Sequence, residues 1–131
     1  MLGIDTNILV RFLVRDDESQ FEKANRLIKR GVIANEGLLV SLIVLLETEW
    51  VLRSRYGLAK AEICAAISGL LESEQLHFED EAAIEEALHF WKDGPAEFAD
   101  CLIGSRNRRL GCRTTMTFDA KAVKVPTFTV L

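Results

Sequence analysis

Two acidic residues stand out because each follows a predicted strand. Asp5 comes after the short apolar segment 2–4 and before a helical pattern that starts at Ile8, so we expect it where a strand ends and a helix begins. Asp119 follows a threonine-rich segment in the same way. In open parallel α/β sheets, ligand sites lie outside the carboxyl ends of the strands. The alternative for both residues is that they only cap the helical turns that follow.

Two further acids lie on predicted helices. Glu47 has apolar residues on its own helix face in both directions, which predicts that it points inward or along the edge of the core; the alternative is that it reaches solvent. Glu49 precedes Arg53 by four residues, a spacing typical of an exposed ion pair. Asp100 has Glu97 one turn before it, with no base between them. Like charges in this arrangement repel unless a cation lies between them.

If the strands are neighbours, these acids converge at one edge of the sheet. Carboxylate oxygens select Mg²⁺ or Mn²⁺, and clustered carboxylates with hydrated magnesium are suited to phosphodiester hydrolysis. Asn7 and Thr117 are candidates for orienting the carboxylates or contacting phosphate, and turn or capping roles explain them equally well. His77 and His89 lie in unrelated places, and we expect both to be structural or surface residues.

Strand patterns alternate with helix patterns along the chain, which predicts a three-layer α/β/α fold with a mainly parallel central sheet. Strands are expected at 2–4, 38–40, 75–78, 112–117 and 127–130. Helices are expected at 6–14, 20–30 with Asp17 or Ser19 as cap, 42–56 after Ser41, 59–71, 81–92 and 96–110, with a helical turn at 119–123.

The composition is that of one soluble domain. The chain has 131 residues, of which 49% are hydrophobic and 27% charged, and no apolar run approaches the ~18 residues of a membrane span. Three cysteines without CxxC spacing indicate a reducing cytoplasm rather than disulfides or a zinc site. We find no signal-peptide pattern, so the predicted location is cytoplasmic.

A net charge of −4 is not typical of a nucleic-acid binder. An RNA substrate would be compatible with this net charge if a divalent cation neutralised the acidic residues and if basic side chains gathered elsewhere. Four arginines are candidates for contacts with an RNA backbone, and the alternative for them is a solvated helix end, where cations also favour the helix dipole. They are Arg106, Arg108, Arg109 and Arg113.

Four short motifs together resemble the PIN domain, and more narrowly the VapC-type toxins of type II (VapBC) toxin–antitoxin systems. The resemblance covers nearly the whole chain and implies a single PIN domain over residues 1–131. It maps the acidic quartet of the family to Asp5, Glu47, Asp100 and Asp119, with Glu97 matching an additional acidic position. The motifs are Ile4-Asp5-Thr6-Asn7, Val44 to Glu47 leading into Trp50 to Arg53, Phe98 to Ile103, and Thr117-Phe118-Asp119.

This resemblance implies a Mg²⁺- or Mn²⁺-dependent endoribonuclease that cleaves structured RNA, tRNA or rRNA, and so inhibits translation. It also implies a homodimer that a cognate VapB-type antitoxin neutralises, with operator DNA contacted only through the antitoxin and no membrane involved. We assign Asp5 and Asp100 as direct metal ligands. Glu47 and Asp119 then support the metal, its waters or a second ion.

Two other classes of protein with acidic sites do not fit this sequence. A receiver-like signalling domain needs a phosphoacceptor aspartate after a middle strand and a lysine after a later one, a placement that the acids here do not follow. A phosphatase with a DxD motif is excluded because position 7 is Asn. A PIN-fold module that binds RNA or protein without turnover and a metal-dependent DNA nuclease remain as alternatives.

Overall fold

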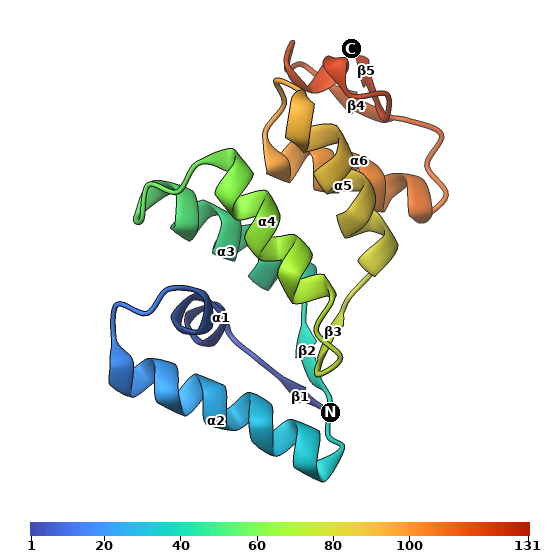
Figure 1. Ribbon diagram of the computed structural model, residues 1–131. Helices are drawn as coiled ribbons and strands as arrows, with labels where there is room; N and C mark the ends of the chain where they lie inside the picture. The colour runs from blue at the N-terminus through green and yellow to red at the C-terminus, as the bar shows by residue number, and fades with distance from the viewer. The chain divides into compact units, whose positions relative to one another are not determined.

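The computed structural model describes residues 1–131, and the chain divides into two compact units, Met1–Glu79 and Asp80–Leu131. We call them the N-terminal unit and the C-terminal unit and describe each by itself (Figure 1). None of the helices is both long and apolar enough to cross a lipid bilayer.

The N-terminal unit contains a three-stranded parallel sheet in the order β1-β2-β3, with four helices. Its central strand is β2, and Leu38 and Val40 on that strand are fully buried. Helix α1 packs against α2 and α3, and α4 packs against α3 and β3. The elements are β1 (Leu2–Gly3), α1 (Thr6–Leu13), α2 (Glu18–Ala34), β2 (Leu38–Val40), α3 (Leu42–Ser54), α4 (Lys60–Leu71) and β3 (Leu76–Phe78).

The C-terminal unit consists of a helix pair and a second parallel sheet of two strands. Helices α5 and α6 pack against each other over Trp91 and Phe98, whose rings lie 5.1 Å apart. Strand β4 contacts α6, and β5 contacts the 3-10 turn η1. The elements are α5 (Glu81–Asp93), α6 (Phe98–Arg109), β4 (Thr115–Thr117), η1 (Ala122–Lys124) and β5 (Phe128–Val130).

The predicted alternation of strands and helices is therefore confirmed, and every strand pair is parallel. Local capping explains why the helix starts were predictable. Asp17 accepts a hydrogen bond from the Gln20 backbone N–H at 3.0 Å, and Ser41 accepts one from the Val44 N–H at 3.3 Å. Such caps satisfy the unpaired N–H groups of a first turn.

Helix α2 is longer than predicted. Gly31 was read as the end of the helix, but it is a buried helical residue, and a side chain there would collide with the Glu36 carbonyl oxygen. The helix ends at Asn35 instead, which adopts the left-handed conformation with φ 51°. Asparagine tolerates this conformation better than most residues do.

Candidate metal-binding acids

Asp5 lies directly after β1 and Ile4, at the edge of the parallel sheet where the carboxyl ends of the strands meet. It is the N-cap of α1, and its Oδ1 accepts a hydrogen bond from the Thr6 N–H at 2.7 Å. The capping alternative is therefore correct as a description of Asp5. The Asp5 carboxylate can still bind a ligand while it caps the helix, because the residue is solvent-exposed and forms no ion pair.

The prediction for Glu47 was wrong in its orientation. Glu47 is exposed, and the buried acid of α3 is Glu49, which is only 3% exposed. The carboxylate of Glu49 pairs with the Arg53 Nε at 2.9 Å, so the predicted ion pair exists but lies on the buried side. Burial of Glu49 is compatible with its charge because Arg53 compensates it. Glu47 has no hydrogen bond or ion pair to its carboxylate, so it is available to a ligand.

Glu79 is a second acid at this edge of the sheet, and it was not among the residues predicted for the site. It follows β3, and its Oε1 accepts a hydrogen bond from the Leu42 N–H at 3.0 Å, at the first turn of α3. The signal was present in the sequence, because Glu79 follows a predicted strand as Asp5 does. Its hydrogen bond to the start of α3 gives it a structural role.

In the C-terminal unit, Asp100 is half-buried in the first turn of α6. Burial raises the pKa of the Asp100 carboxyl, and the negative charges of Asp119 and Glu97 raise it further. Each of these effects disfavours the ionised form. The fold thus brings the charges of Asp119 and Glu97 within electrostatic reach of Asp100.

Asp119 and Thr117 have turn-stabilising hydrogen bonds. Asp119 Oδ1 accepts hydrogen bonds from the Lys121 and Ala122 backbone N–H groups at 2.7 and 3.4 Å, and Thr117 Oγ1 accepts one from the Asp119 N–H at 3.0 Å. These are the capping roles left open for both residues. Asp119 remains exposed and keeps oxygens for a further ligand, because only Oδ1 is engaged.

None of the five candidate acids forms an ion pair with Lys or Arg, whereas several other acids of the chain do. Within either unit, no three His, Cys, Asp or Glu side chains lie close enough to hold a metal ion. The donor set is carboxylate oxygen throughout, which suits Mg²⁺ or Mn²⁺ and not zinc. The candidate acids of the N-terminal unit are Asp5 and Glu47, and those of the C-terminal unit are Glu97, Asp100 and Asp119.

Three of the four arginines proposed for RNA contacts are engaged in ion pairs within the C-terminal unit. Arg106 Nη1 lies 2.5 Å from Asp80 Oδ2, Arg109 pairs with the other oxygen of the same carboxylate, and Arg108 pairs with Glu86. These pairs tie the end of α6 to α5 and its N-cap. The arginines therefore have a structural explanation that the sequence pattern did not reveal.

Comparison with known proteins identifies the family of the chain. The PIN domain family pattern matches residues 3–127. The chain is also 24% identical over 122 residues to a protein named VapC ribonuclease from Aquifex aeolicus (strain VF5), a match that covers 93% of this chain and 90% of that protein. The PIN domain is a three-layer α/β/α fold, so the fold class predicted from the sequence is confirmed. The chain belongs to the PIN domain family.

Proposed function

We propose that the protein is the toxin of a VapBC-type toxin–antitoxin system, acting as a divalent-metal-dependent endoribonuclease. Membership of the PIN family and similarity to a VapC ribonuclease support a nuclease. The observation that carries the proposal is that Asp119 and Glu97 lie near enough to Asp100 for their charges to act on it, while none of the three carboxylates is paired with Lys or Arg. Uncompensated carboxylates near one another are what a hard dication requires and what a purely structural surface avoids.

In this proposal, residues 1–131 act as one PIN domain, and four carboxylates hold Mg²⁺ or Mn²⁺. Asp5 and Asp100 are direct ligands, and Glu47 and Asp119 hold the ion, its waters or a second ion. When bound, the ion supplies a water of lowered pKa and stabilises charge on the leaving oxygen. Glu97 adds negative charge beside Asp100, which strengthens cation binding.

Two polar residues support this chemistry. Asn7 is exposed and lies two residues after the Asp5 cap, where its amide can donate to a phosphate oxygen. Thr117 fixes the backbone at Asp119 through its hydroxyl, so its role is to orient that carboxylate. Asn7 is therefore a substrate-binding residue and Thr117 a positioning residue.

The biological partners follow from the same proposal. The substrate is structured RNA, tRNA or rRNA, the active form is a homodimer, and a VapB-type antitoxin neutralises the enzyme in the cytoplasm. Three cysteines without CxxC spacing support a reducing compartment.

The experiment is to incubate the purified protein with matched RNA and DNA oligonucleotides, with and without Mn²⁺. We expect cleavage of RNA only, and only with the metal. In parallel, the protein is induced in growing cells and the new 5′ ends of cellular RNA are sequenced, which names the target. Cleavage of DNA at the same rate as RNA would assign the chain to the metal-dependent DNA nucleases, and no cleavage of either would leave a binding module.

A further inference from the structure

The N-terminal unit contains two adjoining cavities with basic linings. The larger has a volume of about 540 Å³ and the smaller about 340 Å³, and they share Lys23 and Leu27. No acidic residue lines either one, although the chain as a whole carries a net charge of −4. The larger is lined by Asn7, Ile8, Arg11, Gln20, Lys23, Ala24, Leu27 and Arg55, and the smaller by Lys23, Arg26, Leu27 and Arg30.

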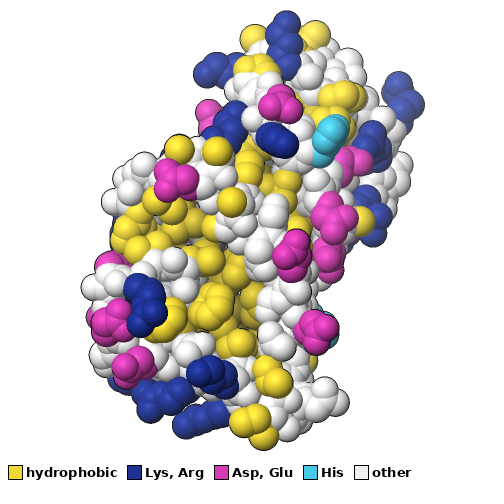
Figure 2. Space-filling view, in the orientation of Figure 1, with side chains coloured by type: hydrophobic (Ala, Val, Ile, Leu, Met, Phe, Trp, Pro, Cys, Tyr) yellow, Lys and Arg dark blue, Asp and Glu magenta, His cyan; other side chains and the backbone are white.

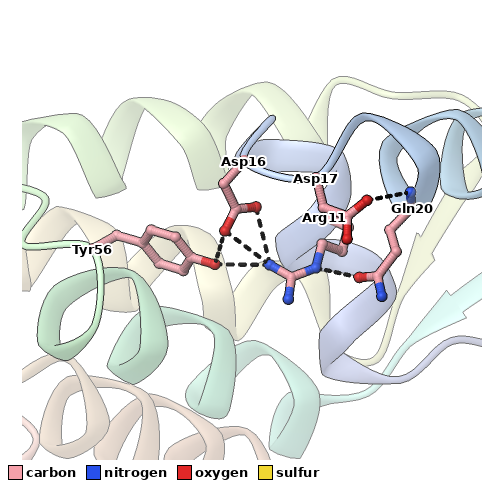
Figure 3. Close-up of polar contacts among 5 residues, drawn as sticks. All are labelled: Arg11, Asp16, Asp17, Gln20 and Tyr56. Atoms are coloured by element: carbon pink, nitrogen blue, oxygen red, sulfur yellow. Dashed lines mark hydrogen bonds and ion pairs between the residues drawn. The ribbon is translucent and has the colours of Figure 1, made fainter.

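Arg11 lines the larger cavity, and its guanidinium group forms polar contacts with three side chains (Figure 3). Its Nη1 donates to Asp16 at 3.0 Å and to the Tyr56 hydroxyl at 2.8 Å, and its Nε donates to Gln20. Tyr56 in turn donates to Asp16 at 2.8 Å. The second terminal nitrogen, Nη2, has no partner, so it is an oriented donor for a ligand in the cavity.

Lys23 and Arg55 carry the uncompensated charge of this cavity. Asp16 offsets the charge of Arg11, but neither the Lys23 nor the Arg55 side chain has a hydrogen bond or an ion pair in the structure. Figure 2 shows Lys and Arg side chains gathered over α2, the helix that carries Lys23. Lys23 and Arg55 are therefore available to a ligand in the cavity, whereas Arg106, Arg108 and Arg109 are already paired.

The lining fits a chain of phosphates better than a single anion. From Lys23 to Arg30 the cations extend over about 10 Å of helix at 1.5 Å per residue, which exceeds the reach of one carboxylate or phosphate. A nucleic-acid strand carries a charge every ~3.4 Å along its axis. The larger cavity also includes Asn7, two residues from Asp5, so a strand bound there lies beside a candidate metal ligand.

We propose that Lys23, Arg55 and the oriented Arg11 bind the phosphate backbone of the RNA substrate, with Arg26 and Arg30 extending the contact along α2. This inference rests on the proposed function and adds to it the surface that holds the substrate. Backbone contacts of this kind supply affinity and register but not sequence preference.

The test uses a fluorescein-labelled stem–loop RNA, with binding measured by fluorescence anisotropy in EDTA over a range of salt concentrations. Cleavage of the same RNA is measured separately with Mn²⁺. The cavity variant is Lys23→Ala/Arg55→Ala. The matched control is Lys29→Ala/Lys92→Ala, which removes two exposed lysines that line neither cavity.

We expect the cavity variant to bind about tenfold more weakly than the control, and its slope of log K against log salt to fall by about 1.5, the value for two lost phosphate contacts. Lys23→Arg/Arg55→Lys should restore most of the binding, and an RNA analogue with an uncharged methylphosphonate backbone should not distinguish the variants. Circular dichroism checks that each variant is folded. If the double variant is not folded, the binding measurement is made with the single variant Arg55→Gln.

Equal affinity and equal salt slope in the cavity and control variants would overturn the inference while leaving the nuclease proposal intact. If the wild-type protein neither binds nor cleaves RNA, the proposed function fails and this inference fails with it. If the cavity variant binds RNA normally but no longer associates with the antitoxin, the cavities belong to a protein partner and the inference is wrong.

Discussion

The Asp119 carboxylate lies close enough to Asp100 to affect its ionisation. Burial of Asp100 raises the pKa of its carboxyl most, and the negative charge of Asp119 raises it further. The two residues come from different elements, since Asp100 is in the first turn of α6 and Asp119 follows β4. The fold therefore places two acids where their charges oppose each other. Neither carboxylate forms an ion pair with Lys or Arg, which supports the proposed cation site.

Asp100→Asn should stabilise the metal-free protein at neutral pH. The pKa of Asp100 is raised in the folded state, so the folded protein favours the protonated carboxyl. The stability that this carboxyl contributes is fully present below its pKa in the unfolded chain, near 3.9. It is lost as the pH rises through the pKa in the folded protein. Thermal unfolding in EDTA should show a higher Tm for the variant at pH 7 and no difference at pH 3. Glu85→Gln, an exposed change on α5, should leave Tm nearly constant. A variant less stable than wild type at pH 7 would contradict this reading.

Divalent metal should raise the stability of the wild-type protein. An ion that binds only the folded state stabilises it by about 1.4 kcal/mol at ten times its Kd. Differential scanning fluorimetry with added Mg²⁺ or Mn²⁺ should show this gain, and Asp100→Asn should lose most of it. The cation-binding interpretation fails if chelator leaves the wild-type Tm unchanged or raises it.

Asp80→Asn should destabilise the protein by about 2–3 kcal/mol, since it removes the charge that Arg106 and Arg109 share. The Asp80 side chain is only 3% exposed. Its burial would raise the pKa, but hydrogen bonds from the two arginines outweigh this effect and the pKa is lowered. The stabilisation is therefore present above the unfolded pKa and fades as pH falls through the folded one.

Urea unfolding at pH 7 and at acidic pH measures this effect. Asp80→Asn should lower the free energy of unfolding by a large amount at pH 7 and by a small amount at acidic pH. Glu81→Gln, which changes an exposed neighbour without an ion pair, should cost no more than about 0.5 kcal/mol. Equal costs for the two variants would show that the buried pairing contributes nothing.

Gly104→Ala should destabilise the C-terminal unit by about 1–3 kcal/mol. A methyl group at Gly104 would overlap Thr127 Oγ1 and approach the Phe128 ring to 2.7 Å, so the segment at β5 would have to move away from α6. Gly69→Ala is the matched control, because that helical glycine has open space around it. The control should stabilise the protein by about 0.5–1 kcal/mol. If both variants changed the stability in the same direction, the close approach of Gly104 to Thr127 and Phe128 would be contradicted.

The parts of this fold that depend on neighbouring residues were predictable from the sequence. Asp17 and Ser41 mark helix starts because capping is decided within one turn. The orientation of α3 was not predictable. Glu47 and Glu49 both have apolar residues nearby, and only the packing of α3 against α1 and α4 decides which of them is buried.

The same limit applies to the basic residues. Arg106 and Arg109 stand together in the sequence and resemble a binding surface, but their partner Asp80 is distant along the chain. Lys23 and Arg55 form no ion pair, are separated in the sequence and meet at one cavity only in the fold. The effect of Glu97 on Asp100 was predictable because the two residues lie one helical turn apart.

The most direct test of the central claim is the rate of RNA cleavage by Asp5→Asn and Asp100→Asn in the presence of Mg²⁺ or Mn²⁺, using tRNA and ribosomal RNA as substrates. Circular dichroism should show that both variants keep the wild-type fold. The account predicts that each variant loses at least about a hundredfold of the wild-type rate and that EDTA abolishes the activity of the wild-type protein. Metal-dependent cleavage at the wild-type rate by both variants would contradict it.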